Sequence, residues 1–555
     1  MQTRFSFPLM LTFAVLVIFS SCKKSNKIGR YIPKNASVVM HVNGESISSK
    51  LPWNEIKQNQ LFQEIYADTA MDGVLKAALD NPENTGIDIK NDLTLFIQKD
   101  SAGGYIALQG NIKDTDKFKA FYTNATKGSV VSGKDGENSV SNNKMIATWN
   151  KERFVIVFDA PQMNNISMNN MPMPGMDSVS TEPLRPVTSR NLQATSALVF
   201  NMAENSSLAK DEKFSGLLKT KGDVHFWMNV GEIGSQTQGM AALSMMNLSK
   251  LYTGSVVTGT ATFLDGKIEM DVKNYAGKEM TELFKKYEGV KINNEMVKRI
   301  PSKDIAVFFA MNFKPQGLLE FVKLAGMEGF ANMGAGFLGF TLDDFVKANK
   351  GEILLTISDL SKDSSGKTDA NFLFSAAIND KAAFGKLIDA GKKAGQSSTS
   401  ENKPQSIFYN QSDKYFVIGN KQAVVDSYIK TETNNSYDFF DKVSGSPVGL
   451  FVNFQYVMRA MVPASTDSLK MAAYNASVQM WDNVIAKGGE FNDGGVIQHI
   501  EINLIDKKVN SLKQLNNYFG ILGNIEKKKK SMGGNIWMDS TSVMMDTTIA
   551  RVPVN

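Results

Sequence analysis

Two stretches of the chain nearly repeat each other, IPKNASVVMHVN at residues 32–43 and IPSKDIAVFFAMN at residues 300–312. Each begins with Ile-Pro, continues into an apolar run rich in β-branched or aromatic residues, and ends in asparagine. Such runs are typical of β-strands. We therefore expect each stretch to open a structural unit with a strand. The buried face of the first strand should match that of the second, so that Val39 corresponds to Val307 or Phe308.

Two further similarities follow in the same order along the chain. ALQGNIKDTDKFKAFY (107–122) resembles FSAAINDKAAFGKLID (374–389), and WNKERFVIV (149–157) resembles YNQSDKYFVI (409–418). The partners of the three pairs lie 260–268 residues apart. A kept order with a nearly constant separation indicates an internal duplication. We predict two homologous halves, residues 31–298 and 299–523.

Each half predicts the element order β-α-β-β-α-β-β. Strands joined by short turns pair in antiparallel fashion. In both halves the second helix starts after acidic residues, and Phe118 and Phe384 should each anchor that helix on the sheet. Phe154 and Phe416 should match in the closing hairpins. The expected fold is α+β, with two tandem halves that are each an antiparallel sheet covered by helices on one face, in a ferredoxin-like arrangement.

Five apolar runs end in asparagine and precede a turn or a helix start. Asparagine at such a joint caps a helix or closes an Asx turn with its own side chain. The alternative interpretation places all five along one ligand groove. The five residues are Asn43, Asn201, Asn229, Asn312 and Asn453.

The N-terminus carries the pattern of a secretory signal. Arg4 precedes an apolar run from Phe5 to Phe19, which is shorter than the roughly 20 residues of a membrane span. Two serines and Cys22, the single cysteine of the chain, follow directly. This segment resembles a bacterial lipoprotein signal, which implies cleavage after residue 21 and lipidation of Cys22. An ordinary secreted protein is the alternative.

The residues that follow Cys22 bear on location. We expect residues 22–30, which are basic, to form a lipid-anchored tether. The resemblance implies an outer-membrane lipoprotein, and the absence of an acidic run after Cys22 favours the side that faces the periplasm.

Composition limits the possible functions. With 61 basic and 56 acidic residues the charges nearly cancel, which is unlike the basic excess of nucleic-acid-binding proteins. One cysteine excludes internal disulfides and cysteine-based zinc sites. His41, His225 and His499 are the only histidines, they fall in separate strand-like runs without metal-ligand spacing along the chain, and we interpret them as structural or surface residues. No cofactor or metal site is predicted, and no catalytic residue.

Two other segments could suggest chemistry. GAGFLG at 334–339 matches a dinucleotide-binding pattern but lacks the preceding strand, so we interpret it as a loop. Residues 160–193 read as an extended loop whose methionines offer soft ligands for Cu(I) as an alternative function. Those methionines are Met163, Met168, Met171, Met173 and Met176. Residues 524–555 are expected to be a mobile tail.

The chain resembles the Bacteroidota lipoproteins grouped as domain of unknown function 4836. The resemblance rests on the start YIPKNASVVMHVN (31–43), the segment TGIDIKNDLTLFI (85–97), the duplication and the lipoprotein signal. The resemblance implies an envelope protein of unknown role and supplies no catalytic residues. We predict a lipid-anchored, non-catalytic module that binds an envelope protein, an envelope polymer or a small ligand on its sheets or between its halves. The alternatives are a hydrolase with an unrecognised carboxylate site and Cu(I) handling by the methionine-rich loop.

Overall fold

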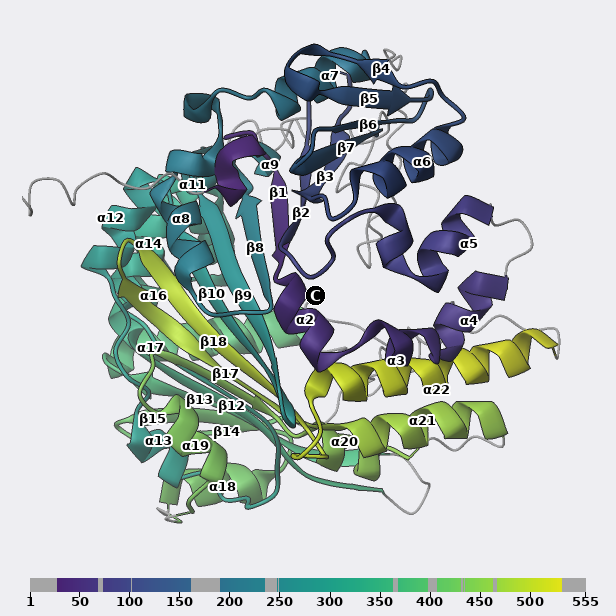
Figure 1. Cartoon of the computed structure of the whole chain (residues 1–555). Helices are drawn as coiled ribbons and strands as arrows, with labels where there is room; N and C mark the ends of the chain where they lie inside the picture. Colours follow the sequence, from purple (N-terminus) through teal and green to yellow (C-terminus); the bar gives the residue numbers. More distant parts are fainter. Residues whose placement is uncertain are drawn as a thin grey trace, which may run out of the picture.

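The structure is a computed structural model (Figure 1), and it describes residues 27–67, 73–100, 102–160, 190–234, 247, 249–362, 368–397, 407–430, 433, 435–462 and 467–531. Within these residues, 18 strands form one continuous sheet in which every strand pair is antiparallel. Helices cover parts of both faces. The protein is therefore α+β, as expected.

The first half contributes ten strands to this sheet. Their spatial order is β4-β5-β6-β7-β3-β2-β1-β8-β9-β10. Their bounds are β1 (Val38–Val42), β2 (Leu93–Gln98), β3 (Tyr105–Asn111), β4 (Val131–Ser132), β5 (Asn138–Ser141), β6 (Met145–Trp149), β7 (Arg153–Asp159), β8 (Val224–Asn229), β9 (Val256–Leu264) and β10 (Lys267–Tyr275).

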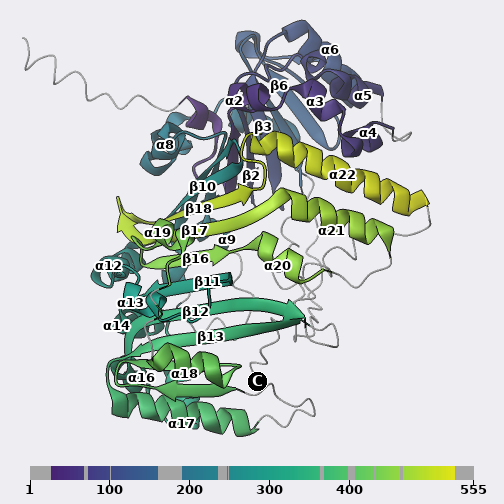
Figure 2. The same cartoon turned by 90° about the horizontal axis from the view of Figure 1, so that it is seen from below.

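The second half repeats the last eight places of this order, from β6 to β10, as β14-β15-β13-β12-β11-β16-β17-β18. The last strands of the two halves, β10 and β18, pair with each other and make the sheet continuous, as Figure 2 shows. The duplicated architecture is thus confirmed. The bounds are β11 (Ile305–Asn312), β12 (Asn349–Lys362), β13 (Thr368–Ile378), β14 (Phe408–Gln411), β15 (Tyr415–Gly419), β16 (Val448–Val452), β17 (Trp481–Asn492) and β18 (Gly495–Leu504).

The helices of the first half connect its strands and cover its ends. They are η2 (Ile28–Tyr31), α2 (Gly44–Lys50), α3 (Trp53–Lys57), α4 (Gln60–Ala67), α5 (Gly73–Asp80), η3 (Pro82–Thr85), α6 (Thr115–Thr126), η4 (Lys134–Gly136), α7 (Leu192–Phe200), η7 (Glu204–Ser206), η8 (Leu208–Lys210), α8 (Glu212–Lys219), α9 (Val230–Gly234), α11 (Ser249–Tyr252), α12 (Lys278–Lys286) and α13 (Asn294–Lys298).

The second half contributes the other helices of the described residues. Its helices are α14 (Pro315–Leu324), α15 (Glu328–Leu338), α16 (Leu342–Ala348), α17 (Lys381–Ser397), α18 (Gln422–Lys430), α19 (Asp438–Val443), α20 (Phe454–Ala460), α21 (Ser468–Met480) and α22 (Ser511–Ser531). None of the helices in the described part of the chain combines the length and the apolar character that crossing a membrane requires.

The expected register of the opening strands is confirmed. Val39 lies opposite Trp227 and is 1% exposed, and Phe308 lies opposite Phe451 and is fully buried. Val307 faces the other side of the sheet and is only half-buried. Alternation along a strand sends neighbouring residues to opposite faces, so Phe308 is the true counterpart of Val39.

The two helix anchors are also confirmed. The ring of Phe118 on α6 lies 5.3 Å from that of Phe154 on β7, and the ring of Phe384 on α17 lies 5.3 Å from that of Phe416 on β15. Phe118 and Phe154 are fully buried, whereas Phe384 is 5% exposed and Phe416 is half-buried. The two contacts are equivalent, and the one in the first half is packed more tightly.

The ferredoxin-like expectation holds for only part of each half. That arrangement makes both helical crossovers split βαβ units, with an antiparallel strand between two parallel ones. The second crossover does this, because β7 lies between β3 and β6, and β15 lies between β13 and β14. The first crossover instead returns the chain beside its starting strand, so β1 pairs with β2 and β11 with β12.

The expectation that helices cover only one face of each sheet was also wrong. The core cluster of Phe118 and Phe154 lies under α6, and a separate cluster of Val39, Val199 and Trp227 lies under α7 on the opposite face. The second half repeats both layers with α17 and with α18 and α19. Both faces of the outer strands are apolar, so each needs a helical cover.

Several expected segment ends differ from those in the structure. Residues 28–30 of the expected tether belong to η2, in which Gly29 is buried. Residues 192–193 of the expected loop begin α7, and residues 524–531 of the expected tail are the last turns of α22, where Ile525 is 6% exposed. GAGFLG lies in α15 and not in a loop, with Gly339 as its left-handed C-cap. Residues 1–26, 161–189 and 532–555 lie outside the described residues.

Candidate functional site

A groove of about 720 Å³ lies over the junction of the two halves. Its floor is formed by β9 and β10 of the first half and by β17 and β18 of the second. These strands lie side by side in the sheet (Figure 1). One wall is α8 with Thr220 after it, and the other includes Gly445 and Ser446 between α19 and β16. The volume is in the range of ligand-binding pockets in proteins.

The floor of this groove carries part of a row of polar residues that crosses the sheet. Successive residues of the row lie directly opposite one another on neighbouring antiparallel strands, and therefore share one face. The row contains all three histidines of the chain. From β2 to β17 it consists of Thr94, His41, His225, Thr260, Asp271, His499 and Lys487. The last four of these line the groove.

His499 stands at the centre of a cluster of carboxylates on this face. Its Nδ1 lies 2.8 Å from Asp271 Oδ1, and its Nε2 lies 3.5 Å from Glu501 Oε1. Glu269 lies directly opposite Glu501 across the β10–β18 pair. Ligand atoms of Glu269, His499 and Glu501 all lie within 4.8 Å of one another.

Lysines partly neutralise these carboxylates. Lys442 of α19 donates to Glu501 Oε2 at 3.0 Å, and Lys267 pairs with Glu269. Burial acts to raise the pKa of Glu501, but the hydrogen bond and charge of Lys442 and the charge of Lys267 together bring it below its usual value. The hydrogen bond with Glu269 raises the pKa of Lys267. Glu501 is therefore ionised at neutral pH.

The other two histidines form a buried pair at the far end of the row. His41 Nδ1 lies 3.1 Å from His225 Nδ1, and His225 Nε2 lies 2.8 Å from the carbonyl oxygen of Thr220. Because a carbonyl only accepts, His225 carries its proton on Nε2, and its Nδ1 accepts from Nδ1–H of His41. A second proton on His41 would lie on Nε2, 3.4 Å from Asp92. Burial lowers the pKa of His225, and the nearby His41 lowers it further.

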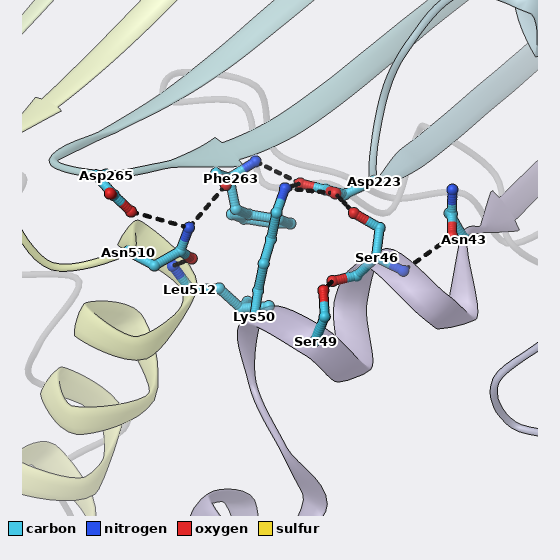
Figure 3. Close-up of polar contacts among 9 residues, drawn as sticks. All are labelled: Asn43, Ser46, Ser49, Lys50, Asp223, Phe263, Asp265, Asn510 and Leu512. Carbon is cyan, nitrogen blue, oxygen red and sulfur yellow. Dashed lines mark hydrogen bonds and ion pairs between the residues drawn. The ribbon is translucent and has the colours of Figure 1, made fainter.

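Asp223 is the most buried carboxylate near this face, and its contacts give it a structural role (Figure 3). It accepts hydrogen bonds from Ser46 Oγ, from Lys50 Nζ at 2.6 Å on both oxygens, and from the Phe263 N–H. Asn510, just before α22, donates to the carbonyl oxygen of Phe263 at 3.0 Å. The network therefore ties α2, β8 and β9 to the C-terminal helix and leaves Asp223 no free acceptor for a substrate.

Three of the five asparagines cap helices as expected. The side chains of Asn43, Asn229 and Asn453 each accept a backbone N–H three residues later. Asn312 instead donates to the carbonyl oxygen of Lys291, and Asn201 follows a helix rather than a strand. None of the five lines the groove at the junction, and Asn453 is the one that lines a second pocket, beside α19.

Cys22 and the five methionines of the loop lie outside the described residues. The interpretation of His499 as a structural or surface residue stays a prediction, but spacing along the chain did not show that the sheet brings its ring beside Asp271 and Glu501. A signal was present in the sequence: Glu269-x-Asp271 and His499-x-Glu501 each place two ligand-type residues on one face of a strand. The sequence did not show that β10 and β18 pair with each other.

These observations define a class, namely an α+β protein with two repeated units in one antiparallel sheet. The family described as "Domain of unknown function (DUF4836)" matches residues 29–172 and 188–437, more than half of the chain. The chain belongs to this family. The matched region covers the first half and the second half as far as α19.

Other comparisons add little. No curated protein matches the chain. Solved structures titled "Structure of crystal form IV of TP0453" and "Structure of crystal form I of TP0453" are both 8% identical to it, with TM-scores of 0.25 and 0.24. They cover 44% and 46% of this chain, and 80% of their own.

Proposed function

We propose that the protein is a lipid-anchored, non-catalytic binding module of the bacterial cell envelope. In this proposal Cys22 carries the lipid, the protein sits on the outer membrane facing the periplasm, and the groove at the junction of the halves holds part of an envelope protein or polymer. The observation that carries the proposal is the groove itself, which is built by strands of both halves.

The lining of the groove suits a polar partner of low net charge. It offers three carboxylates, two lysines and three threonines around the aromatic ring of Tyr275. Lys273 lies 5.1 Å from that ring and 3.9 Å from Asp493, so part of this charge is already paired. An open floor of flat strands can accept an extended segment, whereas small apolar ligands prefer enclosed pockets.

The groove can be tested by filling it. Gly445 lines the groove, and a Cβ added there meets nothing within 4 Å, so Gly445→Trp should block it without destabilising the fold. Gly391→Trp on α17 is the matched control, because it has equal space and lies outside the groove. A photo-crosslinking residue at Lys487 should capture an envelope partner, and Gly445→Trp should abolish the capture while Gly391→Trp leaves it intact. Equal capture in both variants would contradict the groove as the binding site.

Anchoring and catalysis have separate tests. Cys22→Ser should abolish incorporation of labelled fatty acid and leave an unprocessed precursor. Continued labelling of this variant would contradict the lipoprotein proposal.

A panel of glycosidase, esterase and peptidase substrates should give no turnover that depends on Asp271 or Glu501, and loss of a measured activity in Asp271→Asn would favour a hydrolase instead.

A further inference from the structure

The geometry points to a divalent transition-metal site of the zinc type at the junction of the two halves, with Glu269, His499 and Glu501 as ligands and Asp271 as the residue that orients the histidine. The site is independent of the proposed partner binding. It would be shared between the two halves, because Glu269 belongs to β10 and His499 and Glu501 belong to β18.

The sheet sets up the site through its register. Glu269 lies opposite Glu501, and Asp271 lies opposite His499. Since residues two apart on a strand share a face, all four side chains project from the same side of the β10–β18 pair. Ligand atoms of the three proposed ligands already lie within 4.8 Å of one another.

The distances around His499 fit metal ligation better than a hydrogen bond on its Nε2 side. The separation of 3.5 Å between Nε2 and Glu501 Oε1 is long for a hydrogen bond between nitrogen and oxygen. Two ligand atoms that each lie about 2.0–2.1 Å from a tetrahedral ion are about 3.4 Å apart. Nε2 and Oε1 are therefore spaced as two ligands of one ion would be.

The other side of the imidazole supports the same assignment. Asp271 lies 2.8 Å from Nδ1, so Nδ1 carries the proton and Nε2 presents its lone pair toward Glu501. Histidine ligands of metals commonly donate their second N–H to a carboxylate, which fixes the ring and makes the ligating nitrogen more basic. One nitrogen and two carboxylates suit zinc-type ions, and three protein ligands leave a position for water or for a group bound in the groove.

In the absence of an ion, two lysines neutralise the negative charges of Glu501 and Glu269. Lys442 uses Oε2 of Glu501 and leaves Oε1 for the metal. Lys267 pairs with Glu269 and would have to give way at least in part. Removing the charge of Lys267 should therefore tighten metal binding. An ion can enter through the groove, since Asp271 and His499 line it.

The test is titration of the full chain carrying Cys22→Ser with Zn²⁺ by calorimetry and with Co²⁺ by absorption. The serine removes the single thiol as a competing ligand. One Zn²⁺ should bind per chain, and Co²⁺ should develop the visible band of a four- or five-coordinate site. His499→Gln should abolish both signals, Asp271→Asn should weaken the affinity by about 10–100-fold, and Lys267→Met should strengthen it severalfold.

Asp493→Asn is the control, because Asp493 is an exposed groove carboxylate outside the cluster and its loss should leave the affinity unchanged. Circular dichroism will show whether each variant is folded. Absence of Zn²⁺ binding, or equal affinity in the Cys22→Ser chain and its His499→Gln variant, would overturn the inference. So would a loss of affinity in Asp493→Asn as large as that in Asp271→Asn.

Discussion

In the first half His41 of β1 faces His225 of β8, whereas at the matching place in the second half Ala310 of β11 faces Gly449 of β16. The match rests on backbone contacts made by the asparagines that end these strands. The N–H of Asn43 donates to the carbonyl oxygen of Asp223, and that of Asn312 donates to the carbonyl oxygen of Pro447. At these positions the two halves therefore share the same backbone contact, but their side chains differ.

The second half fills the space of the histidines with apolar groups. A Cβ added to Gly449 would lie 2.8 Å from both Ile292 and Val443, so side chains from neighbouring elements already occupy that volume. The buried ion pair of Asp223 is likewise replaced by Pro447. The duplicated unit therefore needs only an apolar core at these positions. The polar row is an added feature of the first half and of the junction.

The largest effects should come from the helix anchors. Phe118→Ala and Phe384→Ala should each lower the free energy of unfolding by about 3–5 kcal/mol. The loss for Phe118→Ala should lie at the upper end of this range, because its ring contacts those of Tyr122, Trp149 and Phe154. The ring of Phe384 contacts only the ring of Phe416 among the described residues. Urea unfolding followed by circular dichroism measures both. A greater loss for Phe384→Ala would contradict the tighter packing of the first half.

The buried carboxylate should have the next largest effect. Asp223→Ala removes the partner of Lys50 and of the Phe263 N–H, and should cost about 3 kcal/mol of unfolding free energy. Pro447→Ala at the matching position should cost clearly less, since no ion pair depends on it. Equal losses in the two variants would mean that this position contributes through its backbone alone.

The histidine pair should make stability depend on pH. Because the pKa of His225 is lower in the folded chain than in the unfolded chain, the unfolded chain binds more protons as pH falls below about 6.5. Stability should therefore fall between that pH and the folded pKa, and should be regained as pH rises. Asp92 and Asp223 face the pair and reduce the effect. Melting temperatures at pH 5–7 should change less in His225→Gln, and an unchanged pH profile would contradict the assignment to this pair.

The smallest effects should come from helix glycines. Gly216 on α8 and Gly385 on α17 both have open space where a Cβ would be added. Alanine at either position should stabilise the protein by about 0.5–1 kcal/mol, because glycine loses more backbone freedom on folding. Thermal unfolding measures the gain. Similar gains would indicate that α8 and α17 are equally well-formed helices in the two halves, and a loss for Gly216→Ala would show that the groove wall is more crowded than its contacts indicate.

The sequence by itself determined the features that depend on local pattern and on comparing the chain with itself. Alternation within one strand decides which residues share a face, so Val39 could be matched to Val307 or Phe308 before any partner strand was known, and the structure selected Phe308. An aromatic residue in the first turn of an acid-started helix predicted the anchors Phe118 and Phe384. Membership of the family also followed from sequence pattern.

Only the tertiary structure decided what depends on which strands are neighbours. The pairing of Asp271 with His499 joins residues 228 positions apart, and nothing local to either strand selects the other. The run ALVFN, at residues 197–201, became the end of a helix because tertiary packing overrides the weak local preference of a short apolar segment. The polar row, the groove and the cluster around His499 arise because long-range pairing of strands brings together side chains that local sequence can place on a face but cannot place beside one another.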